Sequence, residues 1–245
     1  MNNSVGNTAR LIAAGLRALL VLTVICGVIY PLAVTGIAQA LFNDKANGSE
    51  IKDKSGKVVG SSLIGQTYNL PKKTASDSTT GSDAEEAAKP DLKWFQPRPS
   101  NGLGSNSVNT QYSLILSGAT NRSADNGAVG GKCTKDAEEG TLCAQVLAAK
   151  DAVIADNTTA SYQVKPEDVP ADAVTSSGSG LDPNISPEYA ELQVHRVAEK
   201  NGLDLKRVEK LVADHTQGRT LGFMGEPRVN VLELNTALKA ALSKG

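Results

Sequence analysis

The chain has 245 residues, with 25 basic and 26 acidic side chains and a formal net charge of -1. This balance excludes a polybasic nucleic-acid binder and a long acidic tail. Aromatic residues make up only 4% of the chain, so we expect no base-stacking surface for nucleic acid. The 3 cysteines and 2 histidines are too few for a zinc cluster, so we expect no metal site. This length predicts one domain, or two at most.

The N-terminal segment departs from these averages. No charged residue occurs from Ala18 to Asn43, and as a helix this run would be about 39 Å long. A bilayer core of about 30 Å needs about 20 such residues, so we predict one transmembrane helix over residues 18–43, surrounded by membrane lipid. Pro31 lies near the middle and is expected to bend the helix, because proline lacks the backbone donor. No later stretch reaches spanning length, which predicts a single-pass protein.

A cleaved signal peptide is the alternative for this segment. Arg10 and Arg17 form a basic start, and Ala38-Gln39-Ala40 has the small-x-small pattern of a cleavage site. However, the apolar region of a signal peptide is about 7–15 residues long, and this uncharged run is much longer. We therefore favour an uncleaved anchor, with cleavage after Ala40 as the other interpretation.

The orientation of the anchor does not follow from a simple count of positive charges. More lysines follow the run than the two arginines that precede it, so the count alone would place the wrong end inside. Long domains, however, translocate largely regardless of charge. We expect residues 1–17 to be cytoplasmic and residues 44–245 to form an extracytoplasmic domain of a cell-membrane protein.

The anchor contains small residues at spacings that let helices approach each other closely. Thr23 and Gly27 are four residues apart, as are Gly36 and Ala40. Tyr30 lies too deep for an interface anchor and is a candidate packing residue beside Pro31. A plain tether is the alternative to a helix seam. The candidate contacts to partner helices are Thr23, Gly27, Tyr30, Pro31, Gly36 and Ala40.

The remaining residues predict a small α+β domain. Strand-like pieces flank the turn Asp53-Lys54-Ser55-Gly56, which indicates a β-hairpin. Polar insertions are expected near residues 70–91 and 117–142. Ser186 and the following proline predict a helix start, and Asn201-Gly202 its end. A second helix is expected from Asp204, and a short strand over residues 229–231 before a final helix through residue 238.

The cysteines bear on the compartment. Cys133 and Cys143 close a short loop, so a disulfide between them is possible, and it would persist only outside the cytoplasm. Two unpaired thiols are the alternative. Cys26 lies inside the apolar run and is expected to act as a small apolar residue.

Motifs for chemistry give no catalytic residue. The Gly131-Lys132-Cys133 sequence lacks the first glycine and the hydroxyl residue of a phosphate-binding P-loop. His195 and His215 are 20 positions apart without a paired carboxylate motif, and we expect structural roles for both. A catalytic triad built on one of them stays an alternative, because its members need not be close in sequence.

Several blocks of the chain resemble the KdpC family, the C subunits of Kdp-type potassium-transporting ATPases. Their order and number make the resemblance specific, and it extends over the anchor and most of the domain. The two polar insertions depart from the family pattern. The matching blocks are Tyr30–Leu32, Ala46–Ser49, Gly60–Gln66, Trp94–Ser100, Gly104–Asn106, Ser177–Ser186 and Leu221–Asn235.

The resemblance implies a single-pass accessory subunit without a catalytic site of its own. Its partners would be a channel-like potassium-binding subunit and a P-type ATPase subunit, and it would assist assembly and raise the ATP affinity of the pump subunit. ATP is thereby implied for the complex, and for this chain only by the resemblance. The alternative function is an independent membrane-tethered outer enzyme or binding domain. Weak candidates for holding a phosphate are Ser177, Gly178, Ser179, Gly180 and Asp182, for which a structural turn is the preferred interpretation.

Overall fold

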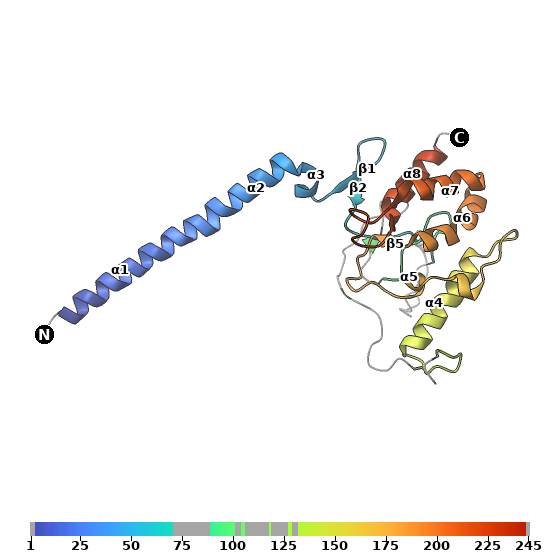
Figure 1. The fold of residues 1–245 in the computed structure, drawn as a ribbon, viewed down its shortest axis with the longest axis horizontal. Helices are drawn as coiled ribbons and strands as arrows, with labels where there is room; N and C mark the ends of the chain where they lie inside the picture. Colours follow the sequence, from blue (N-terminus) through green and yellow to red (C-terminus); the bar gives the residue numbers. More distant parts are fainter. Residues whose placement is uncertain are drawn as a thin grey trace, which may run out of the picture. The chain divides into compact units, whose positions relative to one another are not determined.

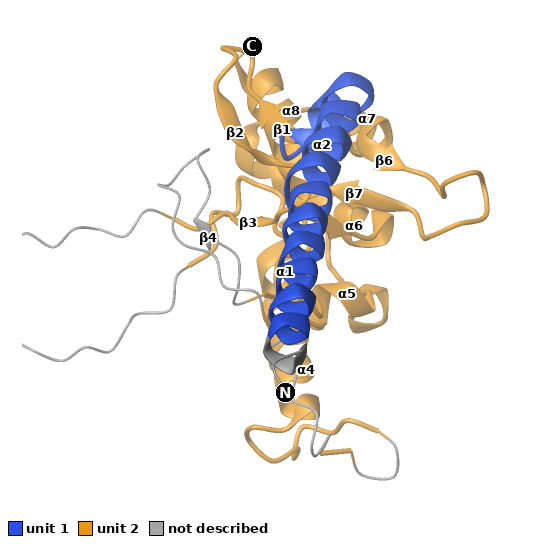
Figure 2. Ribbon diagram, turned by 90° about the vertical axis from the view of Figure 1, so that its left-hand side faces the viewer, with its two compact units in different colours: residues 1–49 blue, residues 50–245 orange. Residues whose placement is uncertain are grey.

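The computed structural model describes residues 3–70, 89–100, 104–105, 118, 127–128 and 132–243. The chain divides into two compact units, Met1–Ser49 and Glu50–Gly245, which Figure 2 colours separately.

Unit 1 is one long helical segment followed by a short turn of helix. Helix α1 (Asn3–Val24), a π-helical turn η1 (Ile25–Ile29) and helix α2 (Tyr30–Leu41) follow one another without a break, and α3 (Asn43–Ala46) comes next (Figure 1). The stretch Gly6–Leu41 is long and apolar enough to cross a membrane, and none of its tested window is buried by the rest of the chain. The helical segment thus extends beyond the predicted run 18–43 at its N-terminal end.

The π turn lies directly before Pro31. The Tyr30 N–H donates to the carbonyl oxygen of Ile25, five residues back, instead of four. Proline offers no N–H to the next bond, and its ring crowds the carbonyl four residues before it, which loosens the helix at this point. The bend expected at Pro31 stays a prediction. The structure shows a change in the hydrogen-bond ladder just before this proline, namely the π turn.

Unit 2 begins with the predicted hairpin. Strand β1 (Glu50–Lys52) pairs antiparallel with β2 (Val58–Ser61). The Asp53 carboxylate closes the turn, because its Oδ1 accepts from Ser55 N (2.9 Å), Ser55 Oγ (2.5 Å) and Lys57 N (3.1 Å). Gly56 supplies the left-handed conformation that the turn needs, with φ of 82°. The hairpin prediction is therefore confirmed.

A second pair of strands lies next to the first insertion. Strand β3 (Gln66–Thr67) runs parallel to β4 (Gly104–Ser105). Just after β3, Asn69 forms an antiparallel bridge with Pro90, and Asp91 N donates to Tyr68 O over 2.8 Å. Residues 68–70 and 89–91 therefore lie side by side in the domain, and the predicted insertion between them stays a prediction. Most of that insertion and much of 117–142 lie outside the described residues.

The C-terminal part contains a three-stranded antiparallel sheet in the order β5-β7-β6. Its strands are β5 (Asn184–Ile185), β6 (Thr216–Gln217) and β7 (Arg228–Asn230). Three helices lie beside the sheet, and each of them contacts the central strand β7 (Figure 1). They are α6 (Pro187–Asn201), α7 (Leu205–His215) and α8 (Val231–Leu242).

The ends of these helices confirm the predicted starts and stops. Ser186 Oγ accepts from Tyr189 N over 3.0 Å, and Asp204 Oδ1 accepts from Lys206 N over 2.9 Å. Gly202 ends α6 in the left-handed conformation, with φ of 62°. The predicted strand 229–231 was shifted by one residue, because β7 is Arg228–Asn230. Asn230 is the N-cap of α8, so Val231 already belongs to the helix, which runs to Leu242 rather than to residue 238.

Helix α4 (Leu142–Asn157) was not predicted from the sequence. It follows a short stretch of turns, and Thr141 caps it by accepting from Ala144 N. A 3₁₀ turn η2 (Pro166–Asp168) and a short helix α5 (Ala171–Val174) connect it to β5. The described end of the second insertion therefore passes directly into an ordered helix.

The core of unit 2 is apolar, but among the residues that the structure describes it contains one buried charge. Its fully buried side chains include Tyr68, Phe95, Val197, Val208, Val229, Leu234 and Leu238. Arg196 of α6 is only 1% exposed and donates to Asn157 Oδ1 (2.8 Å), Gln193 Oε1 (2.7 Å), Trp94 O (3.0 Å) and Leu92 O. Burial lowers the pKa of Arg196 to about 10, so the guanidinium is charged at neutral pH. It links α4, α6 and the segment around Trp94. The chain therefore has the predicted fold class, with one apolar N-terminal helix followed in sequence by an α+β domain.

Candidate functional site

The predicted partner contacts of the anchor are all exposed within this chain. Gly27 lies in the π turn, and a Cβ built on it would approach only Thr23 Cγ2, at 3.9 Å. A Cβ on Gly36 would meet nothing within 4 Å. The space beside both glycines is therefore open in the chain alone. The exposed set comprises Thr23, Gly27, Tyr30, Pro31, Gly36 and Ala40.

The π turn changes how these positions face outward. A π turn holds about one residue more than an α turn, so it rotates the helix after it by about 100° relative to an uninterrupted helix. Gly27 and Gly36, nine positions apart, would otherwise point in opposite directions. The π turn contains Gly27 and precedes Gly36, so the two small-residue pairs do not keep the relative directions of an uninterrupted helix.

The loop 177–182, the weak candidate for phosphate, is closed by its own hydrogen bonds. Gly180 N donates to Ser177 O (3.3 Å), and Leu181 N donates to Ser179 Oγ (3.1 Å). A Cβ on Gly180 would collide with the carbonyl oxygen of Gly118. Gly118 N in turn donates to Ser179 O (2.8 Å). These donors serve the protein itself, so they are not free to cradle a phosphate.

Arg98 holds the end of this loop. Its guanidinium lies 3.4 Å from Asp182 Oδ2 and donates to Thr175 O (3.3 and 3.2 Å) and Ser176 O (3.4 Å). Asp182 Oδ1 meanwhile accepts from Asn184 N (2.9 Å). Ser177 is 3% exposed, and its hydroxyl has no hydrogen-bond partner among the described residues. Arg98 and Asp182 thus fix the backbone of residues 175–184, which leads into β5 and α6, and this indicates a structural role for the loop.

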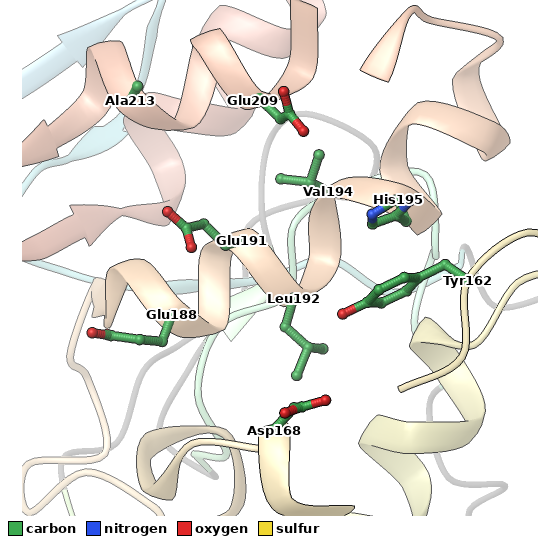
Figure 3. A pocket seen from close by; sticks show the side chains of 9 residues that line it. All are labelled: Tyr162, Asp168, Glu188, Glu191, Leu192, Val194, His195, Glu209 and Ala213. Atoms are coloured by element: carbon green, nitrogen blue, oxygen red, sulfur yellow. The ribbon is translucent and has the colours of Figure 1, made fainter. Parts of the chain in front are cut away.

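A hollow of about 510 Å³ lies beside the first histidine (Figure 3). The rings of Tyr162 and His195 stack over it with centroids 4.0 Å apart and planes 4° apart. Four carboxylates line the hollow, from Asp168, Glu188, Glu191 and Glu209, and its lining contains no serine, threonine, cysteine or basic side chain other than His195. This lining offers no nucleophile for a triad, and it would repel an anion such as a nucleotide phosphate.

The second histidine has a structural contact. His215 Nδ1 lies 2.8 Å from Leu211 O, at the last turn of α7. Among the described residues there is no group of three or more His, Cys, Asp and Glu side chains that would hold a metal ion.

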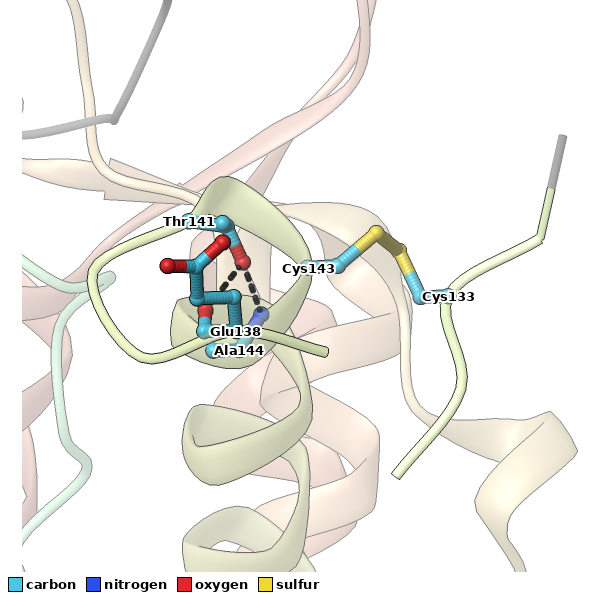
Figure 4. The surroundings of a disulfide bond; sticks show 5 residues. All are labelled: Cys133, Glu138, Thr141, Cys143 and Ala144. Atoms are coloured by element: carbon cyan, nitrogen blue, oxygen red, sulfur yellow. Dashed lines mark hydrogen bonds between the residues drawn. A yellow bond between two sulfur atoms is a disulfide. The ribbon is translucent and has the colours of Figure 1, made fainter. Parts of the chain in front are cut away.

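Cys133 and Cys143 form a disulfide, with Cα atoms 5.0 Å apart (Figure 4). Cys143 is 1% exposed in the first turn of α4, next to the cap in which Thr141 Oγ1 donates to Glu138 O (2.7 Å). The bond ties the end of the second insertion to the start of α4. Cys26 is the free cysteine, and it is exposed in the π turn.

One surface feature escaped the sequence reasoning. Leu221, Phe223 and Met224 are 77%, 72% and 47% exposed in the loop between β6 and β7. The signal for it in the sequence is the apolar run Leu221-Gly222-Phe223-Met224, which is followed by Gly225.

Together these features define a class of protein: a single-pass membrane protein that carries one α+β domain. The chain belongs to the KdpC family, because the model of that family, described as the c chain of K⁺-transporting ATPases, matches residues 12–240.

Relatives with curated names agree with this family. The chain is 67% identical over 239 residues to a "Potassium-transporting ATPase KdpC subunit" of Streptomyces avermitilis, covering 98% of this chain and 97% of that protein. It is 62% identical to the protein of the same name from Streptomyces coelicolor, over 100% of this chain and 99% of that one. A third, from Citrifermentans bemidjiense, is 40% identical over 93% of this chain and 95% of its own length.

Proposed function

We propose that this chain is an accessory subunit of an ATP-driven potassium uptake complex in the cell membrane, which assists assembly and raises the ATP affinity of the pump subunit. The observation that carries the proposal is the match of the family model to residues 12–240, which include both the anchor and the domain. The acidic hollow without a nucleophile supports a role exerted through other subunits rather than through catalysis by this chain.

The proposed topology has residues 1–17 in the cytoplasm, 18–43 in the bilayer and 44–245 outside. The disulfide between Cys133 and Cys143 supports an outer domain, because such bonds persist in oxidising compartments. A membrane-impermeant maleimide tests this in intact cells with Cys26→Ala as background. It should label Ser55→Cys, in the exposed turn after β1, and leave Asn7→Cys unlabelled. The reverse pattern would invert the topology.

The proposed partners are the channel-like potassium-binding subunit and the P-type ATPase subunit. The anchor is the surface for helix contact, since its small residues are exposed and no side chain of this chain fills the space beside Gly36. Interfaces between membrane helices use small residues of this kind because they let backbones approach closely. The channel-like subunit and the pump subunit are therefore expected to bury Thr23, Gly27, Gly36 and Ala40.

The effect on ATP affinity is proposed to be indirect. The loop 177–182 uses donors of its own for internal bonds, and the hollow beside His195 is lined by four carboxylates. An outer domain is also on the opposite side of the membrane from cytoplasmic ATP. The influence on the pump subunit is therefore transmitted through the anchor and its helix contacts.

The test compares the purified complex with and without this chain. With the tag on the pump subunit, this chain should co-purify, and its omission should raise the ATP concentration needed for half-maximal potassium-stimulated hydrolysis. Adding the full chain back in lipid should restore the original value. Recovery of this chain alone, together with full potassium-stimulated activity in its absence, would overturn the proposal and favour an independent outer protein.

A further inference from the structure

The loop between β6 and β7 ends in three exposed apolar side chains. We call Leu221, Phe223 and Met224 the apolar tip; they are 77%, 72% and 47% exposed. None of them belongs to the buried core of the domain. Met224 is one of 2 methionines and Phe223 one of 3 phenylalanines in the chain. An apolar group of this kind on a surface marks a contact site.

The backbone holds the apolar tip in a fixed shape. Thr220 N donates to Met224 O (2.8 Å), and Met224 N donates to Thr220 O (3.0 Å), so the tip is a tight hairpin turn. Below it, Arg219 Nη2 lies 2.7 Å from Glu226 Oε2 and bridges the two sides of the loop. A short pair of hydrogen bonds and an ion pair thus pre-organise side chains that touch nothing in the domain core.

The turn also adopts an unfavourable conformation at a non-glycine residue. Leu221 has φ of 55°, and in the described part of the chain only Ser49 shares a positive φ without being glycine. Leucine in this region is strained by its own Cβ. A strained residue that exposes a large apolar side chain does not stabilise the domain by itself, so its geometry points to a contact outside the chain.

We propose that the apolar tip inserts into an apolar hollow on the outer surface of another subunit of the same ATPase. The inference rests on the proposed function, which places this chain in a complex with other subunits. A rigid, narrow tip suits a hollow of matching shape, because pre-organisation removes the loss of conformational freedom on binding. Phe223 is the central anchor, since buried aromatic side chains carry much of the binding energy of interfaces.

Other occupants fit the charges less well. Loops that dip into a lipid surface gain from free basic residues next to their apolar side chains, whereas Arg219 beside the apolar tip is neutralised by Glu226. A second copy of this chain would have to receive the tip, but the hollow beside His195 contains four carboxylates. A second hollow of about 540 Å³ is lined by Asp172, Asp182, Glu188 and Glu226, by Arg98 and Arg228, and by apolar residues such as Ile185 and Pro227. Both hollows contain several charged side chains, which an inserted apolar side chain would separate from water.

Photo-crosslinking identifies the occupant in the intact complex. Phe223 is replaced by benzoylphenylalanine, the complex is purified in lipid nanodiscs through a tag on the pump subunit, and the adduct is located by mass spectrometry after irradiation. An adduct to an apolar segment of another subunit is the expected result. Adducts only to lipid, only to a second copy of this chain, or to no other molecule would each overturn the inference.

A charge substitution measures the contribution of the contact. In the detergent-purified complex, Phe223→Asp together with Met224→Asp should lower the ratio of this chain to the pump subunit by about tenfold after dilution. Leu63→Asp is the matched control, because Leu63 is an exposed leucine (65%) of the same domain outside the tip, and it should leave the ratio unchanged. Fluorescence of Trp94 verifies that both variants are folded.

The two proposals fail in different ways. If the wild-type chain does not co-purify with the pump subunit, the proposed function is wrong. If the wild-type chain co-purifies and the doubly substituted chain does so equally well, only the inference about the apolar tip is wrong.

Discussion

The two units of this chain satisfy their side chains in opposite ways. In unit 1 every described side chain of the long helix up to Ile37 is exposed, so its apolar surface is covered only by what surrounds the chain. In unit 2 the helices and the small sheet enclose a shared core. The anchor is therefore stabilised by lipid or partner helices, whereas the domain is stabilised by contacts of its own.

The domain's self-sufficiency extends even to a buried charge. The guanidinium of Arg196 is surrounded by acceptors that all belong to unit 2. An unpaired buried charge would be very unfavourable, so these acceptors are needed for the fold. Substitutions in the domain should therefore change its stability, whereas substitutions in the anchor should change assembly.

Arg196→Ala should have the largest effect on stability. It removes the donors to Leu92 O, Trp94 O, Asn157 and Gln193. Gln193 Oε1 and Trp94 O keep hydrogen bonds from Gln96, whereas Leu92 O and Asn157 Oδ1 lose the guanidinium. Disrupting a buried charged network of this kind lowers the free energy of unfolding by about 3–5 kcal/mol. Urea unfolding followed by the fluorescence of Trp94, the single tryptophan and a domain residue, measures it.

Arg207→Ala is the matched control for Arg196. Arg207 is exposed and donates one hydrogen bond to Ala241 O, at 3.0 Å. Its removal should change the free energy of unfolding by less than about 0.5 kcal/mol. Equal losses in the two variants would contradict the special role given to the buried guanidinium.

The disulfide gives the next largest effect. Cys133 and Cys143 are 10 residues apart, and on the chain-entropy model the closed loop contributes about 2–3 kcal/mol. Replacing both by serine should lower the urea midpoint of the domain accordingly. Cys26→Ser, in the anchor, should leave that midpoint unchanged, and reductant should destabilise the wild type but not the double variant. A wild type insensitive to reductant would argue against the bond.

Gly36→Leu tests the anchor side of the comparison. A side chain at this position meets nothing within 4 Å in this chain, so the domain should unfold as in the wild type. A partner helix packed against Gly36 would be displaced, with a loss of about 1 kcal/mol, or about fivefold in co-purification with the pump subunit. Gly15→Leu, before the predicted span, is the control and should co-purify normally. Unchanged assembly of both variants would reduce the anchor to a tether.

Features that depend on neighbouring residues were predictable from the sequence. The turn after β1 needs only Asp53 and Gly56, and α6 needs only Ser186 at its start and Gly202 at its end. The apolar run of the anchor was equally plain, because lipid selects composition rather than a particular partner. In each case the physical cause lies within a few positions of the residue concerned.

Features that depend on distant residues were not predictable. Helix α4 was missed because its apolar side chains are not confined to one face, and its position is fixed by a disulfide and by the contact of Asn157 with Arg196. Nothing in the sequence around Arg196 distinguishes it from the other charged residues of α6, and its burial follows only from the contacts of the folded domain. Leu221 is the converse case, because it is a large apolar residue that the hairpin leaves exposed to solvent.

Asp156→Asn tests the electrostatic environment of the buried Arg196 and has the smallest expected effect on stability. Partial burial raises the pKa of the Asp156 carboxyl above its ordinary value, although Arg196 acts in the opposite direction. The folded state therefore holds this proton more tightly than the unfolded state, and its contribution to stability falls as pH rises from the ordinary value of about 4 through the raised one. Asparagine cannot ionise, so the variant should match the wild type near pH 3 and unfold at a slightly higher temperature at pH 7. The exposed Asp151→Asn on the same helix should show no such gain, and a variant less stable than the wild type at pH 7 would mean that attraction to Arg196 outweighs the burial of the charge.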